Sequence, residues 1–517
     1  MPNRSSDTLF QLVKSLKKSE KRNFKLYIKR NSSAEDLKII QLFDAIDSMD
    51  LYDEAQLLKK CKTIAKQQLS NMKAHLYREI LSSLRLIRNE DNIDMLLHEQ
   101  MDFARILYNR GLYLQSLKTL DKIKELAQKN NQLTFLLQVL FFEKKIEALH
   151  ITRSMQDRAE RLATEVDETN KRLQTIGSLS NLSLQLYSWY IKNGHARNKA
   201  DEAAVQKFFE DGLSSGNGNC ASFYEKLYLF QSYCWYAFIR QDFLLYYRYA
   251  QKWVDLFEKE KFMIETETAH YIKGMHNLLG AHFDLQNYKK FLETLACFEK
   301  FSESDIVKQN DNNLIQTFIY LSISKINKHF IEGTFTEGKQ LVPGILGKLD
   351  QYQLYIDRHR VLVFYYKFAS LYFGSGDYEA AIDYLNKIIN WKVELRTDLQ
   401  CYSRLLHLIA HYELENYQLL EYLIKSVYRF MAKMENLGVV EEEIFNFLRR
   451  SFRLSAKELK PEFQKLLDKL KKLEKNPFAT RAFSYLDIIS WLESKIKGVP
   501  VQDMIREKFL EKQHSLS

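Results

Sequence analysis

Two histidines, His407 and His411, have the spacing at which one helix face presents two metal ligands. Imidazoles four residues apart on a helix can bind zinc. The metalloprotease form of this pair, His-Glu-x-x-His, carries a glutamate as general base, whereas the residues here are Leu-Ile-Ala. His270, His276 and His282 are six residues apart and therefore face different sides of a helix. We expect packing histidines, no metal and no cofactor.

The glycine-rich stretch GLSSGNGN, which begins at Gly212, does not match a phosphate-binding loop. It lacks the Gly-Lys-Ser/Thr ending and follows a predicted helix instead of a strand. We interpret it as a surface loop. Serine, histidine and acidic residues are plentiful, but none lies in a Gly-x-Ser-x-Gly turn or a comparable motif. The sequence therefore predicts a protein that is not an enzyme.

An unusually aromatic stretch between Tyr228 and Trp253 is the first candidate binding surface. Its rings fall on two predicted helices, and most of them must pack between neighbouring helices. An open array of helices cannot bury the whole circumference of each helix. We therefore expect some rings to line its concave face and bind a helical or extended peptide, with arginines pairing to carboxylates. The candidate partner-binding residues are Tyr228, Tyr236, Arg240, Tyr247 and Arg248.

A run of basic residues near the N-terminus is the second candidate surface. Residues 1–90 contain 18 Lys or Arg and 11 Asp or Glu, and so supply +7 of the formal net charge of +10. Phe24 and Tyr27 fall on the apolar stripe, as packing residues do, and not where they would stack on bases. The run is either a solvated helix face or a surface for nucleic-acid phosphates. Its members are Lys14, Lys17, Lys18, Lys21, Arg22, Lys25, Lys29 and Arg30.

The elements that position these residues are expected to be helices. The chain has 517 residues, of which 46% are hydrophobic, and only 16 Gly and 5 Pro, which leaves little material for turns. The five cysteines form no CxxC pair, as is typical of reduced thiols. The N-terminus has no signal-peptide pattern, and no run of about 18 apolar residues occurs. These features predict a cytoplasmic protein without a membrane span.

The clearest structural pattern is a helix, a turn and a second helix between Val361 and Val393. Its apolar residues recur at helical spacing on both sides of a Gly-Asp-Tyr turn. The spacing resembles the tetratricopeptide (TPR) signature, W-x2-L-G-x2-Y and then A-x3-F. The signature residues are matched, in order, by Tyr365, Phe368, Ala369, Tyr372, Ala381 and Leu385. Val393 occupies the place of the terminal proline.

Equivalent turns recur along most of the chain. The predicted turn anchors are Tyr113, Gln156, Asn198, Phe243, Tyr288, Phe335, Tyr378 and Tyr417, which are 43, 42, 45, 45, 47, 43 and 39 residues apart. This period exceeds the TPR period of about 34 residues, so the hairpins must contain longer helices or loops. His282, His329 and His411 each precede an anchor by six residues, as Tyr372 does, which supports a packing role. Pro343-Gly344 is expected to break one second helix.

The resulting prediction is an all-α protein, a right-handed α-solenoid of TPR-like hairpins with helical caps at both ends. We divide it into a basic N-terminal region (1–93), the solenoid (94–434) and a C-terminal cap (435–517). The resemblance implies a non-enzymatic scaffold or adaptor that binds a protein or peptide segment in its concave face. The alternative is a nucleic-acid-associated regulator that uses the basic N-terminal helices. The sequence leaves the oligomeric state open.

Overall fold

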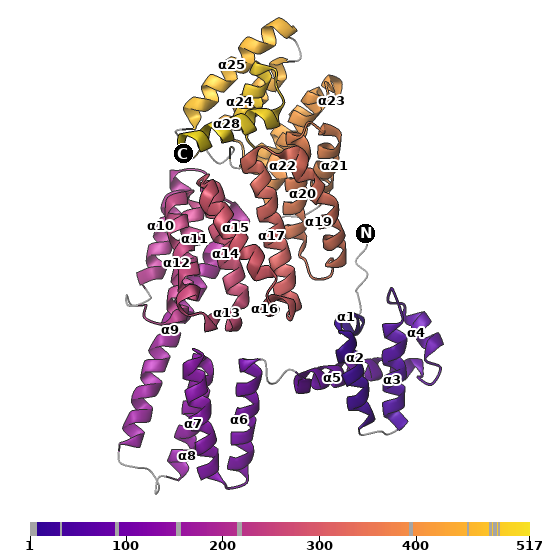
Figure 1. The fold of residues 1–517 in the computed structure, drawn as a ribbon, viewed down its shortest axis with the longest axis vertical. Coiled ribbons are helices and arrows are strands. Elements are labelled where there is room, and N and C mark those ends of the chain that lie inside the picture. The colour runs from indigo at the N-terminus through magenta and orange to yellow at the C-terminus, as the bar shows by residue number, and fades with distance from the viewer. Residues whose placement is uncertain are drawn as a thin grey trace. The chain divides into compact units, whose positions relative to one another are not determined.

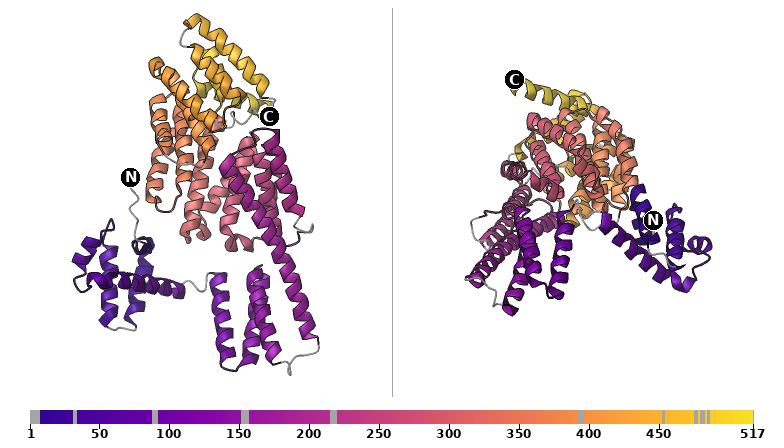
Figure 2. Two further views of the ribbon diagram at one scale, coloured as in Figure 1. Left: turned by 180° about the vertical axis from the view of Figure 1, so that it is seen from behind. Right: turned by 60° about the horizontal axis from the view of Figure 1, so that its bottom comes forward.

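The computed structural model describes residues 8–30, 34–87, 92–150, 157–214, 220–391, 396–451, 454–474, 478, 483 and 486–516. Within these ranges all regular secondary structure is helical, and successive helices pair as hairpins (Figures 1 and 2). The expected all-α array of helical hairpins is confirmed. The chain divides into two compact units, 1–169 and 170–517. The finer division at residues 93 and 434 stays a prediction.

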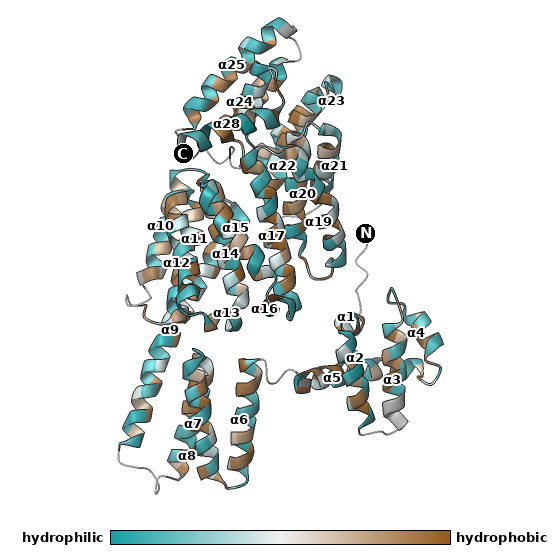
Figure 3. Cartoon of the chain, viewed as in Figure 1, coloured by the Kyte–Doolittle hydropathy of each residue, from teal (hydrophilic) through white to brown (hydrophobic). Residues whose placement is uncertain are grey.

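The first unit begins with five helices that share one core. They are α1 (Thr8–Ser15), α2 (Lys18–Lys29), α3 (Ala34–Asp47), α4 (Glu54–Lys60) and α5 (Lys66–Ile87). Each is apolar along one side, as the brown stripes in Figure 3 show, and these sides meet around Phe24 and Phe43, whose ring centroids are 4.8 Å apart. Three longer helices follow: α6 (Ile93–Asn109), α7 (Tyr113–Lys129) and α8 (Leu133–Leu149).

Helix α9 (Arg158–Asn193) carries the chain from the first unit into the second. Its 36 residues are continuous, so the second helix of one expected hairpin and the first helix of the next are fused. The periodic pattern did not predict this fusion. The predicted anchor Gln156 lies outside the described residues, as do Val393 and residues 215–219 of the glycine-rich stretch.

The second unit consists of stacked hairpins followed by C-terminal helices. The hairpin helices are α10 (Lys199–Ser214), α11 (Phe223–Ile239), α12 (Phe243–Lys259), α13 (Phe262–Thr266), α14 (Thr268–Asp284), α15 (Tyr288–Ser302), α16 (Asp305–Lys308), α17 (Asp311–Glu332), α18 (Phe335–Gly338), α19 (Val342–Gln351), α20 (Arg358–Gly374), α21 (Tyr378–Ile389), α22 (Thr397–Glu413) and α23 (Tyr417–Lys433). The C-terminal helices are α24 (Val439–Ser451), α25 (Ala456–Leu473), α27 (Ile488–Lys497) and α28 (Val501–Leu516).

One turn geometry recurs between the helices of the hairpins. The second helix begins on the predicted anchor at Tyr113, Phe243, Tyr288, Phe335, Tyr378 and Tyr417. Two positions earlier the backbone φ is positive, at Gly111, Gln241, Gln286, Gly333, Gly376 and Glu415. In the clearest turn, Asp377 N–H donates to the Tyr372 carbonyl at 2.9 Å and closes the first helix, and the Asp377 carboxylate caps the second. The break expected at Pro343 occurs earlier, because a short 3-10 turn (Lys339–Leu341) follows α18 and the proline is tolerated in the first turn of α19.

Helix α28 packs against hairpins that lie far earlier in the chain. Arg506 Nη1 donates to the Glu332 carbonyl at 3.1 Å, and Gln502 Oε1 accepts from the Thr336 hydroxyl at 2.8 Å. The contact is close at Gly333, where a β-carbon would lie 2.5 Å from the Arg506 amide nitrogen. Helix α28 therefore docks on the C-terminal end of α17.

Candidate functional site

Two of the predicted partner-binding residues are engaged within the fold. The Arg240 guanidinium donates to Glu202 Oε1 at 2.7 Å and to the Tyr236 hydroxyl at 2.9 Å. Tyr236 is buried and stacks on Phe209, with ring centroids 4.1 Å apart. These contacts join α11 to α10, so the pair stabilises a helix interface.

The other three predicted partner-binding residues have separate neighbours. Tyr228 on α11 is half-buried, and its ring lies edge-on to His270. Tyr247 on α12 lies 5.1 Å from His282, measured between ring centroids, and Arg248 is exposed. The structure therefore does not gather the five residues into one surface, and their role in binding stays a prediction.

The basic N-terminal run is partly neutralised by α3. Lys21 Nζ lies 2.5 Å from Asp47 Oδ1, Lys25 Nζ lies 2.6 Å from Asp44 Oδ1, and Lys14 Nζ donates to the Asp47 carbonyl at 2.7 Å. The other members of the run are exposed: Lys17, Lys18, Arg22, Lys29 and Arg30. Phe24 is fully buried, as its place on the apolar stripe predicted. A smaller basic surface thus remains on α2 and on the residues that flank it.

A set of cations and aromatic rings extends across α14, α17 and α20, and we call it the cation–aromatic row. It consists of Lys273, His276, Tyr320, Arg360 and Lys367, all half-buried. The His276 and Tyr320 rings stack with centroids 4.1 Å apart. Arg360 lies over Tyr320 and donates to its hydroxyl at 3.4 Å. Sequence reasoning missed this row because its members come from three hairpins and share no local motif.

Among the residues that the structure describes, no carboxylate lies at ion-pair distance from the two lysines of the row. Lys273 Nζ lies over the rings of Tyr187 and Trp235, 5.3 and 5.6 Å from their centroids. Lys367 Nζ donates to Asn327 Oδ1 at 2.6 Å and lies over Phe330. Burial lowers the pKa of Lys273, and the nearby Arg360 lowers it further. Burial also lowers the pKa of Lys367 to about 8. Arg360 pairs with Asp357 at 3.2 Å, so the positive charge of this half-buried row that has no ion-pair partner is that of its two lysines.

Lys367 also lines a cavity of about 700 Å³, which we call the α28 chamber. The C-terminal ends of α14, α17 and α20 form one side of the chamber, and α27 and α28 contribute to the other. Aromatic side chains dominate its lining, among them Phe243, Phe283, Phe330, Phe335, Phe373 and Phe509. This size and apolar lining are typical of ligand pockets, which measure about 300–1,000 Å³.

Asp284, the last residue of α14, also lines the α28 chamber. Burial raises the pKa of its carboxyl group to about 7, although Lys367 acts in the opposite direction. The two residues influence each other's pKa, yet their charged atoms lie beyond the ion-pair distance of 4.0 Å. The chamber therefore holds an acid and a base that do not neutralise each other by direct contact.

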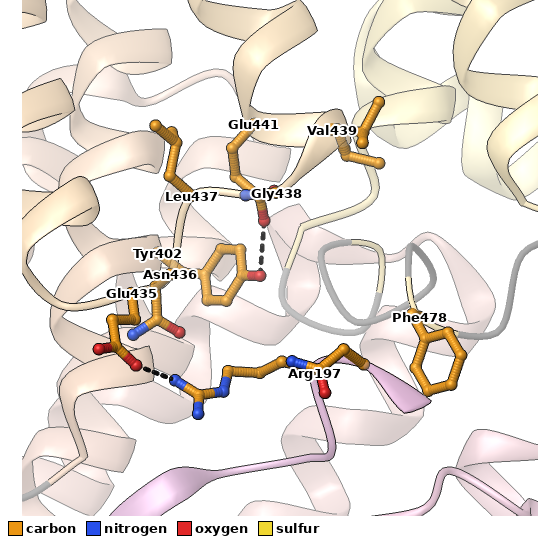
Figure 4. Close-up of a pocket in the computed structure, with 11 residues that line it drawn as sticks. Arg197, Tyr402, Glu435, Asn436, Leu437, Gly438, Val439, Glu441 and Phe478 are labelled. Atoms are coloured by element: carbon orange, nitrogen blue, oxygen red, sulfur yellow. Dashed lines mark hydrogen bonds and ion pairs between the residues drawn. The ribbon is translucent and has the colours of Figure 1, made fainter. Parts of the chain in front are cut away.

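A smaller cavity of about 280 Å³ lies where the α9–α10 connection meets the α23–α24 connection (Figure 4). Arg197 Nη1 donates to Glu435 Oε2 at 2.9 Å, and the Tyr402 hydroxyl donates to Glu441 Oε1 at 2.7 Å. Arg197 also pairs with Asp201 at 2.8 Å. Because these charged groups bind one another, we assign this region to holding together segments of the second unit that are distant in sequence.

The candidate metal histidines lie in helix packing. The His407 and His411 rings pack edge-on with centroids 4.4 Å apart, and burial lowers the pKa of His407 to about 4. The carbonyls of His282, His329 and His411 each accept a hydrogen bond from the backbone N–H five residues later, as the Tyr372 carbonyl does from Asp377. No group of three or more His, Cys, Asp or Glu side chains in the described residues has the geometry of a metal site. None of the described helices is both long and apolar enough to cross a bilayer.

Comparisons with known proteins show a distant structural likeness. No protein-family model and no curated protein matches the sequence. Among solved structures, the chain is similar to the apo form of the quorum sensor NprR from B. thuringiensis, with a TM-score of 0.41 and 14% sequence identity. The alignment covers 74% of this chain and 99% of that chain.

Proposed function

We propose that the protein is a non-enzymatic, TPR-like interaction module that binds a peptide or protein segment along the cation–aromatic row. The observation that carries this proposal is the pair of half-buried lysines, Lys273 and Lys367, which lie over aromatic rings and have no carboxylate at ion-pair distance among the described residues. A charged group held away from water costs free energy unless an oppositely charged or hydrogen-bonding group meets it. Carbonyl oxygens of a peptide backbone, or a carboxylate side chain, would supply that group.

The aromatic rings in and beside the row support recognition of side chains. Tyr187 and Trp235 flank Lys273, and Tyr320 lies between His276 and Arg360. Aromatic faces contribute contact area at a low cost in conformational entropy, and aromatic residues and arginine dominate binding hot spots. Successive hairpins would thus present alternating cationic and aromatic positions to a bound segment.

Peptide selection with the full chain tests this proposal. Peptides enriched from a random library would be synthesised and titrated against the full chain and its Lys273→Met variant. We expect the variant to bind about 10- to 100-fold more weakly, because a hydrogen bond to a charged group is lost. Lys300→Met serves as the matched control, since Lys300 is an exposed lysine on α15 of the same unit. Equal affinities of all three proteins would refute a role for the row.

A further inference from the structure

The charges of the α28 chamber suggest the kind of group that fits it. Lys508 is neutralised by Glu493 at 2.6 Å, Lys512 donates to the Gln286 carbonyl at 3.1 Å, and Asp487 caps α27 by accepting from the Ser490 amide. Glu474, also in the lining, is exposed at the rim. The remaining charged groups of the described lining are Asp284 and Lys367.

Asp284 has no hydrogen-bond donor in the described structure, and Lys367 uses one of its three donors on Asn327. A purely anionic ligand would meet repulsion from Asp284, and a purely cationic ligand would meet repulsion from Lys367. A ligand whose amine and acceptor oxygen are separated by two carbon atoms can satisfy both groups, because Asp284 and Lys367 line the same chamber and act on each other electrostatically without forming an ion pair.

The rest of the chamber is suited to an apolar side chain. Phe283 comes from the end of α14, Phe330 from α17, Phe373 from α20 and Phe509 from α28, so rings enclose the charged pair from several elements. An apolar group that enters this lining gains roughly 25 cal/mol for each Å² removed from water. A zwitterion without an apolar side chain would lose this contribution.

We propose that the α28 chamber binds an amino-terminal residue: a protonated α-amine at Asp284, the oxygen of the adjoining carbonyl or carboxylate at Lys367, and an apolar side chain among the phenylalanines. Two sources carry this chemistry, a free amino acid and the first residue of a peptide. The peptide source rests on the proposed function. A peptide could extend from the chamber along the cation–aromatic row, since Lys367 belongs to both.

Titration calorimetry of the full chain with three probes tests the inference: phenylalanyl-alanine with a free amine, its N-acetylated form, and free L-phenylalanine. We expect the free-amine dipeptide to bind and acetylation to weaken it about 10- to 100-fold, since a charge-assisted hydrogen bond is lost. Free L-phenylalanine that binds as tightly as the dipeptide would identify the amino acid as the source. Weaker binding of the amino acid would identify the peptide.

Asp284→Asn should reduce affinity for the free-amine dipeptide by a similar factor, and Asp503→Asn, an exposed carboxylate on α28, should not. The comparison of free and acetylated dipeptide uses the unaltered protein, so it tests the inference even if Asp284→Asn fails to fold. Equal affinity for the free and acetylated dipeptides, or no binding of the dipeptide and of phenylalanine, would overturn the inference. Binding of a library-selected peptide that is weakened by Lys273→Met but unchanged by acetylation of the peptide's N-terminus would support the proposed function and contradict only the assignment of the α28 chamber.

Discussion

Replacing Asp284 by Asn should stabilise the second unit in a pH-dependent way. Burial raises the pKa of Asp284 to about 7 from an ordinary value of 3.8, so the folded state holds this proton more tightly than the unfolded state does. The corresponding stability is fully present below about pH 4 and is lost as the pH rises towards 7. Asparagine does not ionise and therefore avoids this loss.

The size of the effect follows from the pKa difference. About three pKa units correspond to at most about 4 kcal/mol, at 1.36 kcal/mol for each unit. Water in the chamber solvates part of the charge, and the substitution removes the attraction to Lys367. We therefore expect Asp284→Asn to gain about 2 kcal/mol in the free energy of unfolding near pH 7.5 and almost nothing near pH 4.

Urea unfolding at these two pH values, followed by tryptophan fluorescence, measures the gain. All five tryptophans lie in the second unit, so the signal reports that unit alone: Trp189, Trp235, Trp253, Trp391 and Trp491. Asp503→Asn is the control for loss of a negative charge at an exposed position. A change in stability that is the same at both pH values would refute the reasoning, because it would place the Asp284 carboxylate in water.

Three further predictions concern packing and charge. Gly333→Ala and Gly376→Ala should each lower the free energy of unfolding by about 1–2 kcal/mol, because both glycines have a left-handed backbone. Gly333→Ala should lower it by about 1–3 kcal/mol more, because its β-carbon meets the α28 backbone. Equal urea midpoints of the two variants would contradict the docking of α28. Ala381→Leu should destabilise by about 1–3 kcal/mol, since Ala381 is fully buried at the α21 crossing, and an unchanged midpoint would show that its repeat position is wrong. Changing Lys17, Lys18, Arg22 and Lys29 to Glu should leave the fold and the protein partners intact in circular dichroism and pull-down assays. Loss of all protein partners would refute this, and salt-dependent nucleic-acid binding that this variant abolishes would favour the alternative function.

The sequence predicted the hairpins because their turns are local. The residue at positive φ, the cap at Asp377 and the aromatic anchor Tyr378 are consecutive, so each turn leaves a compact signature that repeats along the chain. The length of α9 was not predictable from the period alone, because the pattern contains helical spacing on both sides of residue 170 and no marker that separates one helix from two.

The candidate site depended on contacts that spacing cannot reveal. Lys273 and Lys367 lie 94 residues apart in sequence (367 − 273), and each resembles an ordinary surface lysine until the hairpins are stacked. The α28 chamber also needs the C-terminal helix, since Phe509 meets a lining that begins at Phe243. Conversely, Arg240 had the sequence features of a partner-binding residue, and its ion pair with Glu202 became visible only in the fold.

Photocrosslinking tests whether a peptide binds along the cation–aromatic row. A library-selected peptide carrying a benzophenone group would be irradiated in complex with the full chain, and the attachment sites would be mapped by mass spectrometry. We expect attachment to α14, α17 and α20, next to Lys273, Tyr320 and Lys367, and loss of attachment in the Lys273→Met variant. Attachment confined to residues 1–169, or to the second helices of the hairpins such as α12, α15 and α21, would contradict it.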